Sequence, residues 1–473
     1  MIISLLMLSK KIKFLKYKNR NFSINSKEVK KNDIFFAIEG SKQSGVLYSS
    51  EALSKGAFKV VTSKNIKNKN YLVVKNVRKF LAEACSVKYK EKPNNIIAVT
   101  GTNGKSSVAN FYFQILKNLK KNSAAIGTLG IFYKNKFKRT SLTTPDTITI
   151  HKELNFLKKN TINYVCLEAS SHGLHQNRLD SINFKAGIFT NFTQDHLDYH
   201  KNLKNYLKAK LYLFSSLLKK NSFAIIDTDI PEYSILNKIC KRRKINILSF
   251  GSKGNTIKLI SHNYLGKQQI IKINFLNKIY NIRINLIGDF QIKNLFAAIL
   301  AAYLSSKNPN KIINTLSKIK SAKGRMQYVG SKKKHSAVVV DYAHTPDALK
   351  KSLQTLAKQF NKKIDLVFGC GGDRDQGKRY KMGRIANQFA SKIYLTNDNP
   401  RSENPNFIIS QIKKGCPKSK IILDRKIAIR SAIKNLNTDS ILLIAGKGHE
   451  NYQIINNKKK YFSDQKVSKK FLK

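Results

Sequence analysis

The sequence predicts an α/β protein with three domains and a mostly parallel central sheet. Short apolar, β-branched runs alternate with helix-period stretches along most of the chain, as they do where helices join parallel strands. The 473 residues suffice for two to four domains at roughly 100 to 200 residues each. Hydrophobic residues (41%) and charged residues (25%) are near ordinary globular values, which excludes a disordered or fibrous chain.

The first domain is expected at residues 1–90, as a small α/β module. Strands are predicted at 33–38 and 58–62, with a helix at 49–55 between them. The apolar run at 1–8 has no basic residue before it and no small-residue cleavage site after it. We therefore interpret this run as an ordinary first element and not as a signal peptide.

The second domain is expected at 91–320 and the third at 321–473. Both alternate predicted strands with helical segments. The strands of the second are predicted at 96–100, 163–167, 186–190 and 222–226, its helices at 206–218 and 292–304, and its hairpins at 257–287. The strands of the third are predicted at 336–341, 364–368, 392–395 and 440–444.

Basic residues dominate the charge, with 89 Lys and Arg against 27 Asp and Glu and a net charge of +62. The lysines are dispersed, often beside asparagine, whereas a nucleic-acid groove concentrates basic side chains among aromatics. We interpret the charge as compositional drift on solvated faces and expect no nucleic-acid partner. Steering of phosphorylated substrates stays open as a second effect.

The location is predicted from cysteines and hydropathy. The five cysteines are far apart and form no CxxC pair, which favours a reduced compartment and gives no zinc site. No uncharged apolar stretch approaches the roughly 18 to 20 residues of a membrane span. We expect a cytoplasmic monomer with no membrane partner.

A phosphate-binding loop is predicted at 101–107, where GTNGKSS follows a strand and opens a helix. Backbone N–H groups and the positive helix end can cradle phosphate oxygens there. Lys105 would reach the terminal phosphates and the Ser106 hydroxyl would hold Mg²⁺. The alternative is a Gly-rich turn with a surface lysine, because Val99 stands where the general pattern has glycine. The proposed loop comprises Gly101, Thr102, Asn103, Gly104, Lys105, Ser106 and Ser107.

This loop, with other segments in the same order, resembles the Mur ligase family of peptidoglycan synthesis from about residue 24 to 450. The segments are LTTPD (142–146), LEASSHGLHQNR (167–178), TNFTQDHLDYH (190–200), YLKAKLYLF (206–214), DYAHTPD (341–347), GCGGDRDQGKR (369–379), DNPR (398–401) and GKGHE (446–450). The resemblance implies a small first domain, a P-loop-type central domain and a Rossmann-like third domain.

The resemblance also implies the reaction. ATP and Mg²⁺ would convert the γ-carboxylate of D-glutamate in a UDP-N-acetylmuramoyl dipeptide into an acyl phosphate, which the amine of meso-diaminopimelate attacks. Lys105, Glu168, His196 and Lys210 would carry the chemistry, and no residue stands out as the base. Ser106, Glu168, His196 and Lys210 would hold the metal, with Lys210 carbamylated because an ammonium would repel the ion. Taken alone, His196 is equally a turn residue and Lys210 a surface lysine.

The resemblance places the nucleotide and the two substrates on further residues. Asn294, Arg325 and Asp341 would contact the nucleotide, although Gln291 and Gln327 depart from the family's asparagine and glutamate. Ile24 and Ser26, with 41–43 after them, would hold the uridine diphosphate, although Lys27 stands where arginine is common. The sugar-peptide residues would be Thr143, Thr144, Ser170, Gln176 and Arg178. The diaminopimelate residues would be Arg374, Asp398, Asn399, Pro400, Arg401, Gly446 and Glu450.

The resemblance implies that Arg401 selects diaminopimelate over lysine as the incoming amino acid. Diaminopimelate carries a second carboxylate that lysine lacks, and a guanidinium held by Pro400 would bind that group through charge-assisted hydrogen bonds. The alternatives are a lysine-adding, folate-polyglutamylating or other Mur-type ligase, a basic nucleic-acid-binding NTPase, and a binding module without catalysis.

Overall fold

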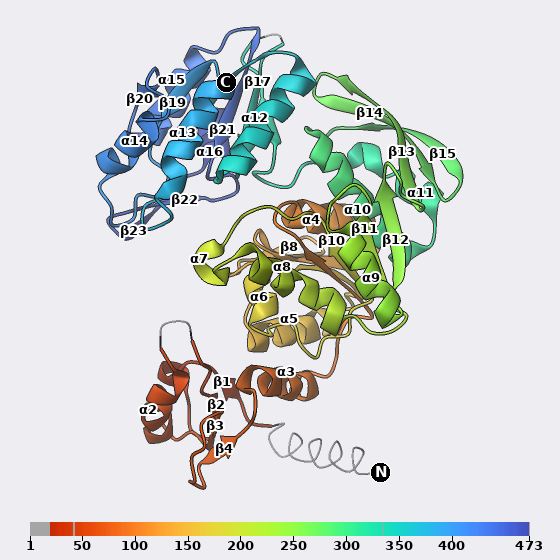
Figure 1. Ribbon diagram of the computed structural model, residues 1–473, viewed down its shortest axis with the longest axis vertical. Helices are drawn as coiled ribbons and strands as arrows, with labels where there is room; N and C mark the ends of the chain where they lie inside the picture. The colour runs from red at the N-terminus through yellow and green to blue at the C-terminus, as the bar shows by residue number, and fades with distance from the viewer. Residues whose placement is uncertain (1–18, 41–42, 334, 473) are drawn as a thin grey trace.

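The computed structural model describes residues 19–40, 43–333 and 335–472, so the expectation for residues 1–8 lies outside the described residues. Three sheets follow one another along the chain, each with its own helices (Figure 1). The first module lies at one end of the long axis and the last at the other, with the largest sheet between them.

The first module is a four-stranded parallel sheet with helices on both faces. Neighbouring side chains on one strand point to opposite faces. Phe36 packs toward α3 (Val77–Lys88), whereas Phe35 packs toward α2 (Ser49–Ser54). The strands are β1 (Phe22–Ser23), β2 (Ile34–Phe36), β3 (Lys59–Thr62) and β4 (Tyr71–Val73).

The central sheet has eleven strands in the order β15-β14-β13-β12-β11-β10-β5-β9-β6-β7-β8. The strands β13, β12, β11, β10, β5, β9 and β6 pair in parallel, and antiparallel hairpins extend both edges. The predicted hairpins at 257–287 therefore continue this sheet. The parallel strands are β5 (Asn95–Thr100), β6 (Ser123–Gly127), β9 (Tyr164–Glu168), β10 (Ala186–Phe189), β11 (Phe223–Asp227) and β12 (Asn246–Gly251). The hairpin strands are β7 (Gly130–Tyr133), β8 (Lys136–Lys138), β13 (Ile257–Leu265), β14 (Gln268–Phe275) and β15 (Lys278–Ile284).

Helices cover both faces of this sheet and bury two apolar clusters. On one face α4 (Lys105–Asn118) and α10 (Asp289–Ser306) pack on the strands, and on the other α5 (Thr147–Lys159), α8 (Leu203–Tyr212) and α9 (Tyr233–Arg243) do so. The predicted helix at 206–218 is shifted. It begins at Leu203 because the side chain of Asn202 accepts the Asn205 N–H as a cap, and a π-helical turn follows it at Leu213–Leu217.

The third module is a six-stranded sheet that is parallel except for its first strand. The strand order is β16 (Gln327–Gly330), β17 (Ala337–Asp341), β21 (Ser440–Ala445), β18 (Lys363–Phe368), β19 (Lys392–Leu395) and β20 (Lys420–Ile421). One face packs on α12 (Pro346–Phe360), α13 (Gly377–Phe389) and α14 (Pro405–Lys413). The other packs on α15 (Arg425–Lys434) and α16 (Asp464–Leu472).

The end of α12 joins the third module to the central one. Gln359 accepts the Gly288 N–H at 2.8 Å and donates to the Gly266 carbonyl at 3.0 Å. No helix within the described ranges is both long and apolar enough to cross a bilayer. All five cysteines are buried free thiols in the structure.

Candidate functional site

A cavity of about 550 Å³ lies where the carboxyl ends of the central parallel strands face the third module. Ligands in open α/β sheets bind at this edge. Residues from both modules line it, because the third module contributes Arg325 and the start of α12. Of the residues predicted from the sequence, the cavity brings together Thr102, Asn103, Gly104, Lys105, Ser106, Ser107, Thr143, Glu168, Ser170, His196, Lys210, Asn294, Arg325 and Asp341.

The predicted phosphate loop forms the floor of the cavity between β5 and α4. Gly101 (φ +139°) and Gly104 (φ +91°) adopt backbone conformations that favour glycine. A Cβ on Gly104 would lie 2.3 Å from the Asn294 side-chain oxygen, so the loop also needs glycine for space. The side chain of Asn191 accepts the Asn103 N–H at 2.9 Å, which fixes the loop against the segment after β10.

Two lysines meet on one backbone oxygen in this loop. The ammonium groups of Lys105 and Lys210 each lie 2.8 Å from the Gly101 carbonyl oxygen. Lys105 therefore folds back onto its own loop, whereas the sequence analysis placed it toward the phosphates. Lys210 is buried, which overturns the surface alternative. Burial and the neighbouring Lys105 hold the pKa of Lys210 well below its ordinary range.

Glu168, the last residue of β9, is the acidic centre of the cavity. Its Oε2 accepts hydrogen bonds from the hydroxyls of Ser106 at 3.0 Å and Thr128 at 3.1 Å. Its Oε1 accepts the Thr128 N–H at 2.9 Å, and Thr128 also contacts the Thr143 hydroxyl at 2.9 Å. A carboxylate held by three donors has a defined orientation, as a metal ligand requires.

His196 lies in the loop after β10, with a left-handed backbone (φ +52°). Its Nε2 is 3.5 Å from a carboxylate oxygen of Asp195, and its ring is 4.9 Å from that of His172. Burial lowers the pKa of His196, and burial together with His196 lowers that of His172 to about 4. Both imidazoles are therefore neutral at neutral pH, the form that binds metals.

The donor set suits Mg²⁺ in part. A serine hydroxyl and a carboxylate are oxygen ligands of the kind Mg²⁺ takes, whereas an ammonium is not a ligand. Lys210 fits only as a carbamate, and its lowered pKa favours the neutral amine from which a carbamate forms. In the part of the chain that the structure describes, no three His, Cys, Asp or Glu side chains converge on one point.

The predicted sugar-peptide residues form a network beside Glu168. Arg178 donates from Nη1 to the Thr144 carbonyl at 2.7 Å and from Nη2 to the Gln176 amide oxygen at 2.6 Å. Thr144 donates to the backbone carbonyl of Glu168 at 2.7 Å and lies 3.0 Å from the Ser170 hydroxyl. This network fixes the orientation of the Arg178 guanidinium.

The predicted nucleotide residues come from both modules. The side chain of Asn294 on α10 donates to the Gln291 side-chain oxygen at 3.1 Å. Gln291, which stands where the family has asparagine, therefore orients Asn294. Arg325 reaches the Ser106 hydroxyl at 3.4 Å and lies 4.5 Å above the Tyr342 ring. Asp341 is buried, which raises its pKa, and both its oxygens accept backbone N–H groups.

The predicted diaminopimelate residues gather at a second place, in loops after β18, β19 and β21 of the third module. Arg401 has a left-handed backbone (φ +56°) and donates from Nη1 to the Gly372 carbonyl at 2.6 Å. Among the described residues, its Nε and Nη2 have no hydrogen-bond partner, so one edge of the guanidinium is free. Gly446 packs against Asp398, and Arg374 is exposed.

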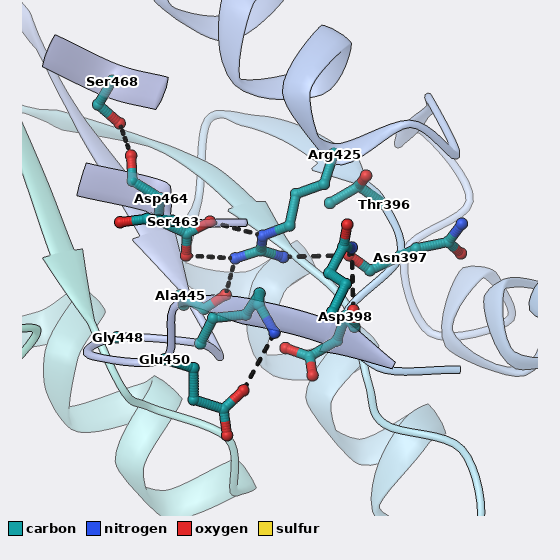
Figure 2. A network of polar contacts seen from close by, with 12 residues as sticks. Thr396, Asn397, Asp398, Arg425, Ala445, Gly448, Glu450, Ser463, Asp464 and Ser468 are labelled. Carbon is teal, nitrogen blue, oxygen red and sulfur yellow. Dashed lines mark hydrogen bonds and ion pairs between the residues drawn. The ribbon is translucent and has the colours of Figure 1, made fainter. Parts of the chain in front are cut away.

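A buried ion pair contacts the loops after β19 and β21. Arg425 binds both carboxylate oxygens of Asp464 at 2.8 Å and also donates to the Ala445 carbonyl at 2.9 Å and the Asn397 carbonyl at 3.4 Å. Figure 2 shows Arg425 between Asp464 on one side and the loop that carries Asp398 on the other. This pair could not be predicted from the sequence, because residues 39 positions apart carry no local signal.

The two residues predicted in the first module do not reach the cavity. Ile24 is partly exposed, and the hydroxyl of Ser26 is buried and donates to Glu51 at 2.7 Å. Residues 41–42 of the segment expected beside them lie outside the described residues. Thr128, Asn191 and Lys447 are further site residues that the sequence analysis missed; only Asn191 and Lys447 lie within motifs that it quoted.

A glycine-rich loop between a parallel strand and a helix, at the carboxyl edge of an open sheet, is an arrangement in which α/β enzymes bind nucleotide phosphates. The Mur ligase middle domain model matches residues 99–302, and the Mur ligase, glutamate ligase domain model matches residues 324–448. The chain belongs to the Mur ligase family, whose members are ATP-dependent, amide-forming ligases.

Named relatives cover nearly the whole chain. The UDP-N-acetylmuramoyl-L-alanyl-D-glutamate--2,6-diaminopimelate ligase of Rickettsia montanensis is 43% identical over 97% of both chains. The ligase of the same name from Rhizobium meliloti (strain 1021) is 37% identical over 95% of this chain and 93% of its own. A solved structure with that name is 32% identical, with a TM-score of 0.70 over 96% of this chain and 94% of that chain. MurF from Thermotoga maritima, solved with ADP, is 19% identical with a TM-score of 0.62 over 91% of this chain and 95% of its own, and shows the fold alone.

Proposed function

We propose that this protein uses ATP to join meso-diaminopimelate to the D-glutamate γ-carboxylate of UDP-N-acetylmuramoyl-L-alanyl-D-glutamate. Relatives with that name, 37% to 43% identical over nearly the full length, support the choice of reaction. The protein acts as a cytoplasmic monomer in peptidoglycan precursor synthesis. The first domain (1–90) holds the uridine diphosphate through Ile24 and Ser26, the second (91–320) binds ATP, and the third (321–473) binds the amino acid.

The reaction has two steps. The γ-phosphoryl group of ATP passes to a carboxylate oxygen of the dipeptide, giving ADP and an acyl phosphate. The amine of diaminopimelate then attacks the carbonyl carbon, loses a proton, and expels phosphate that carries the carboxylate oxygen. Backbone N–H groups of 101–107 and the start of α4 bind the ATP phosphates. Arg325, which belongs to the third domain, places a positive charge opposite the phosphates.

Bound Mg²⁺ would neutralise the phosphate oxygens and polarise the group in transfer. Ser106, Glu168, His196 and a carbamate on Lys210 would hold it. The carbamate is supported by the position of Lys210. Two ammonium groups on one carbonyl oxygen repel each other, and the second positive charge disappears when Lys210 loses its proton and takes up carbon dioxide.

Arg401 carries the choice of amino acid. Its Nη1 is anchored on the Gly372 carbonyl, so its Nε–Nη2 edge is presented in a fixed position for a carboxylate. Diaminopimelate has that carboxylate at its far end and lysine lacks it. Arg374, Asp398, Asn399, Pro400, Gly446 and Glu450 complete this subsite.

The test is phosphate release by the purified protein with ATP, Mg²⁺ and the UDP-sugar dipeptide. We compare meso-diaminopimelate, L-lysine and no amino acid. Release with diaminopimelate alone supports the proposal. Equal release with lysine contradicts the role of Arg401, and release that depends on added nucleic acid contradicts the ligase function.

A further inference from the structure

A further charged side chain, Lys447, lies inside the amino-acid subsite. Lys447, in the loop after β21, is completely buried, although lysine in this chain is mostly exposed. Burying an ammonium without a partner costs several kcal/mol. The contacts of Lys447 therefore indicate what this position requires.

Lys447 connects two loops of the subsite in a closed triangle. Its Nζ donates to the Asn399 side-chain oxygen at 2.9 Å and to Glu450 Oε2 at 3.0 Å. The Asn399 amide nitrogen also donates to Glu450 Oε2, at 2.9 Å. Lys447 and the Ile454 N–H, which donates to the same Asn399 oxygen at 3.1 Å, together fix which end of the Asn399 amide faces Glu450. The other oxygen of Glu450, Oε1, lies outside the triangle.

The ammonium also balances the charge of Glu450. Buried Asp464 already pairs with Arg425, and Glu403 pairs with Arg379, so these carboxylates are matched as well. Arg401, by contrast, donates to backbone carbonyls alone within the described ranges. An incoming amino acid whose far end carries both a carboxylate and an ammonium can pair its carboxylate with Arg401 and its ammonium with Glu450. A lone ammonium meets Glu450, whose charge Lys447 already compensates, and Asp398 is the one carboxylate placed in this subsite that forms no ion pair among the described residues.

We infer that Lys447 determines specificity: its buried ammonium holds Asn399 and Glu450 in place and cancels the charge of Glu450, so that the subsite accepts a zwitterionic far end and rejects a purely cationic one. This inference rests on the proposed function. Lys447 is a positioning residue, because it acts through Glu450 and Asn399.

The first test is Lys447→Met, which keeps the length of the side chain and removes its charge. The ratio of kcat/KM for L-lysine to kcat/KM for meso-diaminopimelate should rise about tenfold to a hundredfold, the value of one charge-assisted hydrogen bond. The KM for ATP should not change. The control is Lys358→Met, which removes a pair with Asp289 of similar length (2.9 Å) on the surface and should leave the ratio unchanged.

The double variant Lys447→Met/Glu450→Gln separates charge from packing. It leaves no unpaired buried charge, so it should fold even if Lys447→Met does not, as a thermal melt will show. Because the pair is again neutral, the ratio should return toward the wild-type value, although both activities fall. If Lys447→Met does not fold, a double variant that folds and strongly prefers lysine contradicts the inference, and a ratio near wild type supports it.

Different results would contradict the inference about Lys447 and the proposed function. If the wild type prefers diaminopimelate and folded Lys447→Met loses both activities by the same factor, the function stands and Lys447 is merely structural. If the wild type releases no phosphate with either amino acid, the proposed function fails and the inference fails with it.

Discussion

A Cβ atom on Gly324 would lie 2.1 Å from the carbonyl carbon of Gly448, so the two backbones are in direct contact. Gly324 precedes Arg325, which reaches Ser106 in the nucleotide cavity. Gly448 lies in the loop that carries Lys447 and Glu450. The contact therefore joins the nucleotide cavity to the amino-acid subsite through the backbone.

Replacing Gly324 should disturb both sites. Gly324→Ala adds a clash with backbone at a residue of φ +65°, and overpacking of this kind costs about 1–3 kcal/mol. We expect lower stability toward urea and a higher KM for both ATP and diaminopimelate. The control is Gly266→Ala, because Gly266 has a similar φ (+56°) but nothing within 4 Å of an added Cβ. Equal effects of the two substitutions would contradict the role of the contact.

The side-chain amine of Lys210 should be required for activity. Lys210→Met should reduce phosphate release by about a hundredfold or more, since it removes a charge at the transferring group. Removing carbon dioxide and bicarbonate should lower wild-type activity, and isotope-labelled bicarbonate should give a carbamate signal that the variant lacks. Lys208→Met, at an exposed position on the same helix, serves as the control. A variant with full activity would exclude a metal-binding carbamate at this position.

Arg401 should act on one substrate only. Arg401→Lys keeps the charge but loses the flat, two-pronged edge, so kcat/KM for diaminopimelate should fall about tenfold to a hundredfold. The KM for ATP should stay the same. Arg384→Lys, on the exposed side of α13, should change neither value. The assignment fails if the Arg401 variant loses affinity for ATP and diaminopimelate alike.

Removing one partner of the Arg425–Asp464 pair should destabilise the protein strongly, whereas replacing both partners should destabilise it much less. Either Arg425→Met or Asp464→Leu leaves one charge buried and unpaired, which should lower the free energy of unfolding by about 3–5 kcal/mol. The double variant should recover much of that loss in urea unfolding. It should still show a raised KM for diaminopimelate, because the Asn397 and Ala445 carbonyls have lost their donor. A normal KM in a stable double variant would limit the pair to a role in folding.

The stability should depend on pH through His151. This side chain is fully buried, and burial lowers its pKa to about 3, against about 6.5 in an unfolded chain. Below about pH 6.5 only the unfolded state gains the proton, so stability is complete above that pH and falls as the pH drops toward 3. His151→Gln should flatten this dependence by up to about 1.4 kcal/mol per pH unit in urea unfolding. Exposed His335→Asn should not, and equal slopes for the two variants would refute the assignment.

The sequence predicted what depends on local pattern. The loop at 101–107 could be located because its glycines, lysine and serines follow a β-branched strand and open a helix. The strand β6 was missed, since its sequence SAAIG at 123–127 is made of small residues with weak strand character. The boundary of α8 was missed because the Asn202 cap precedes the apolar pattern.

Burial and charge pairing could not be predicted. Nothing within YLKAKLYLF distinguishes buried Lys210 from exposed Lys208, since the difference arises from helix orientation against the Gly101 loop. The same holds for Lys447, whose partners lie 48 and 3 residues away and meet only once β19 and β21 share a sheet.

The central claim is that this cavity activates a carboxylate as an acyl phosphate. The most direct measurement uses a UDP-sugar dipeptide whose γ-carboxylate carries heavy oxygen, together with ATP, Mg²⁺ and diaminopimelate. The released phosphate is then analysed by mass spectrometry. We predict that each phosphate contains one heavy oxygen, because the carboxylate oxygen leaves with it. Phosphate without heavy oxygen, formed along with the amide product, would contradict the account.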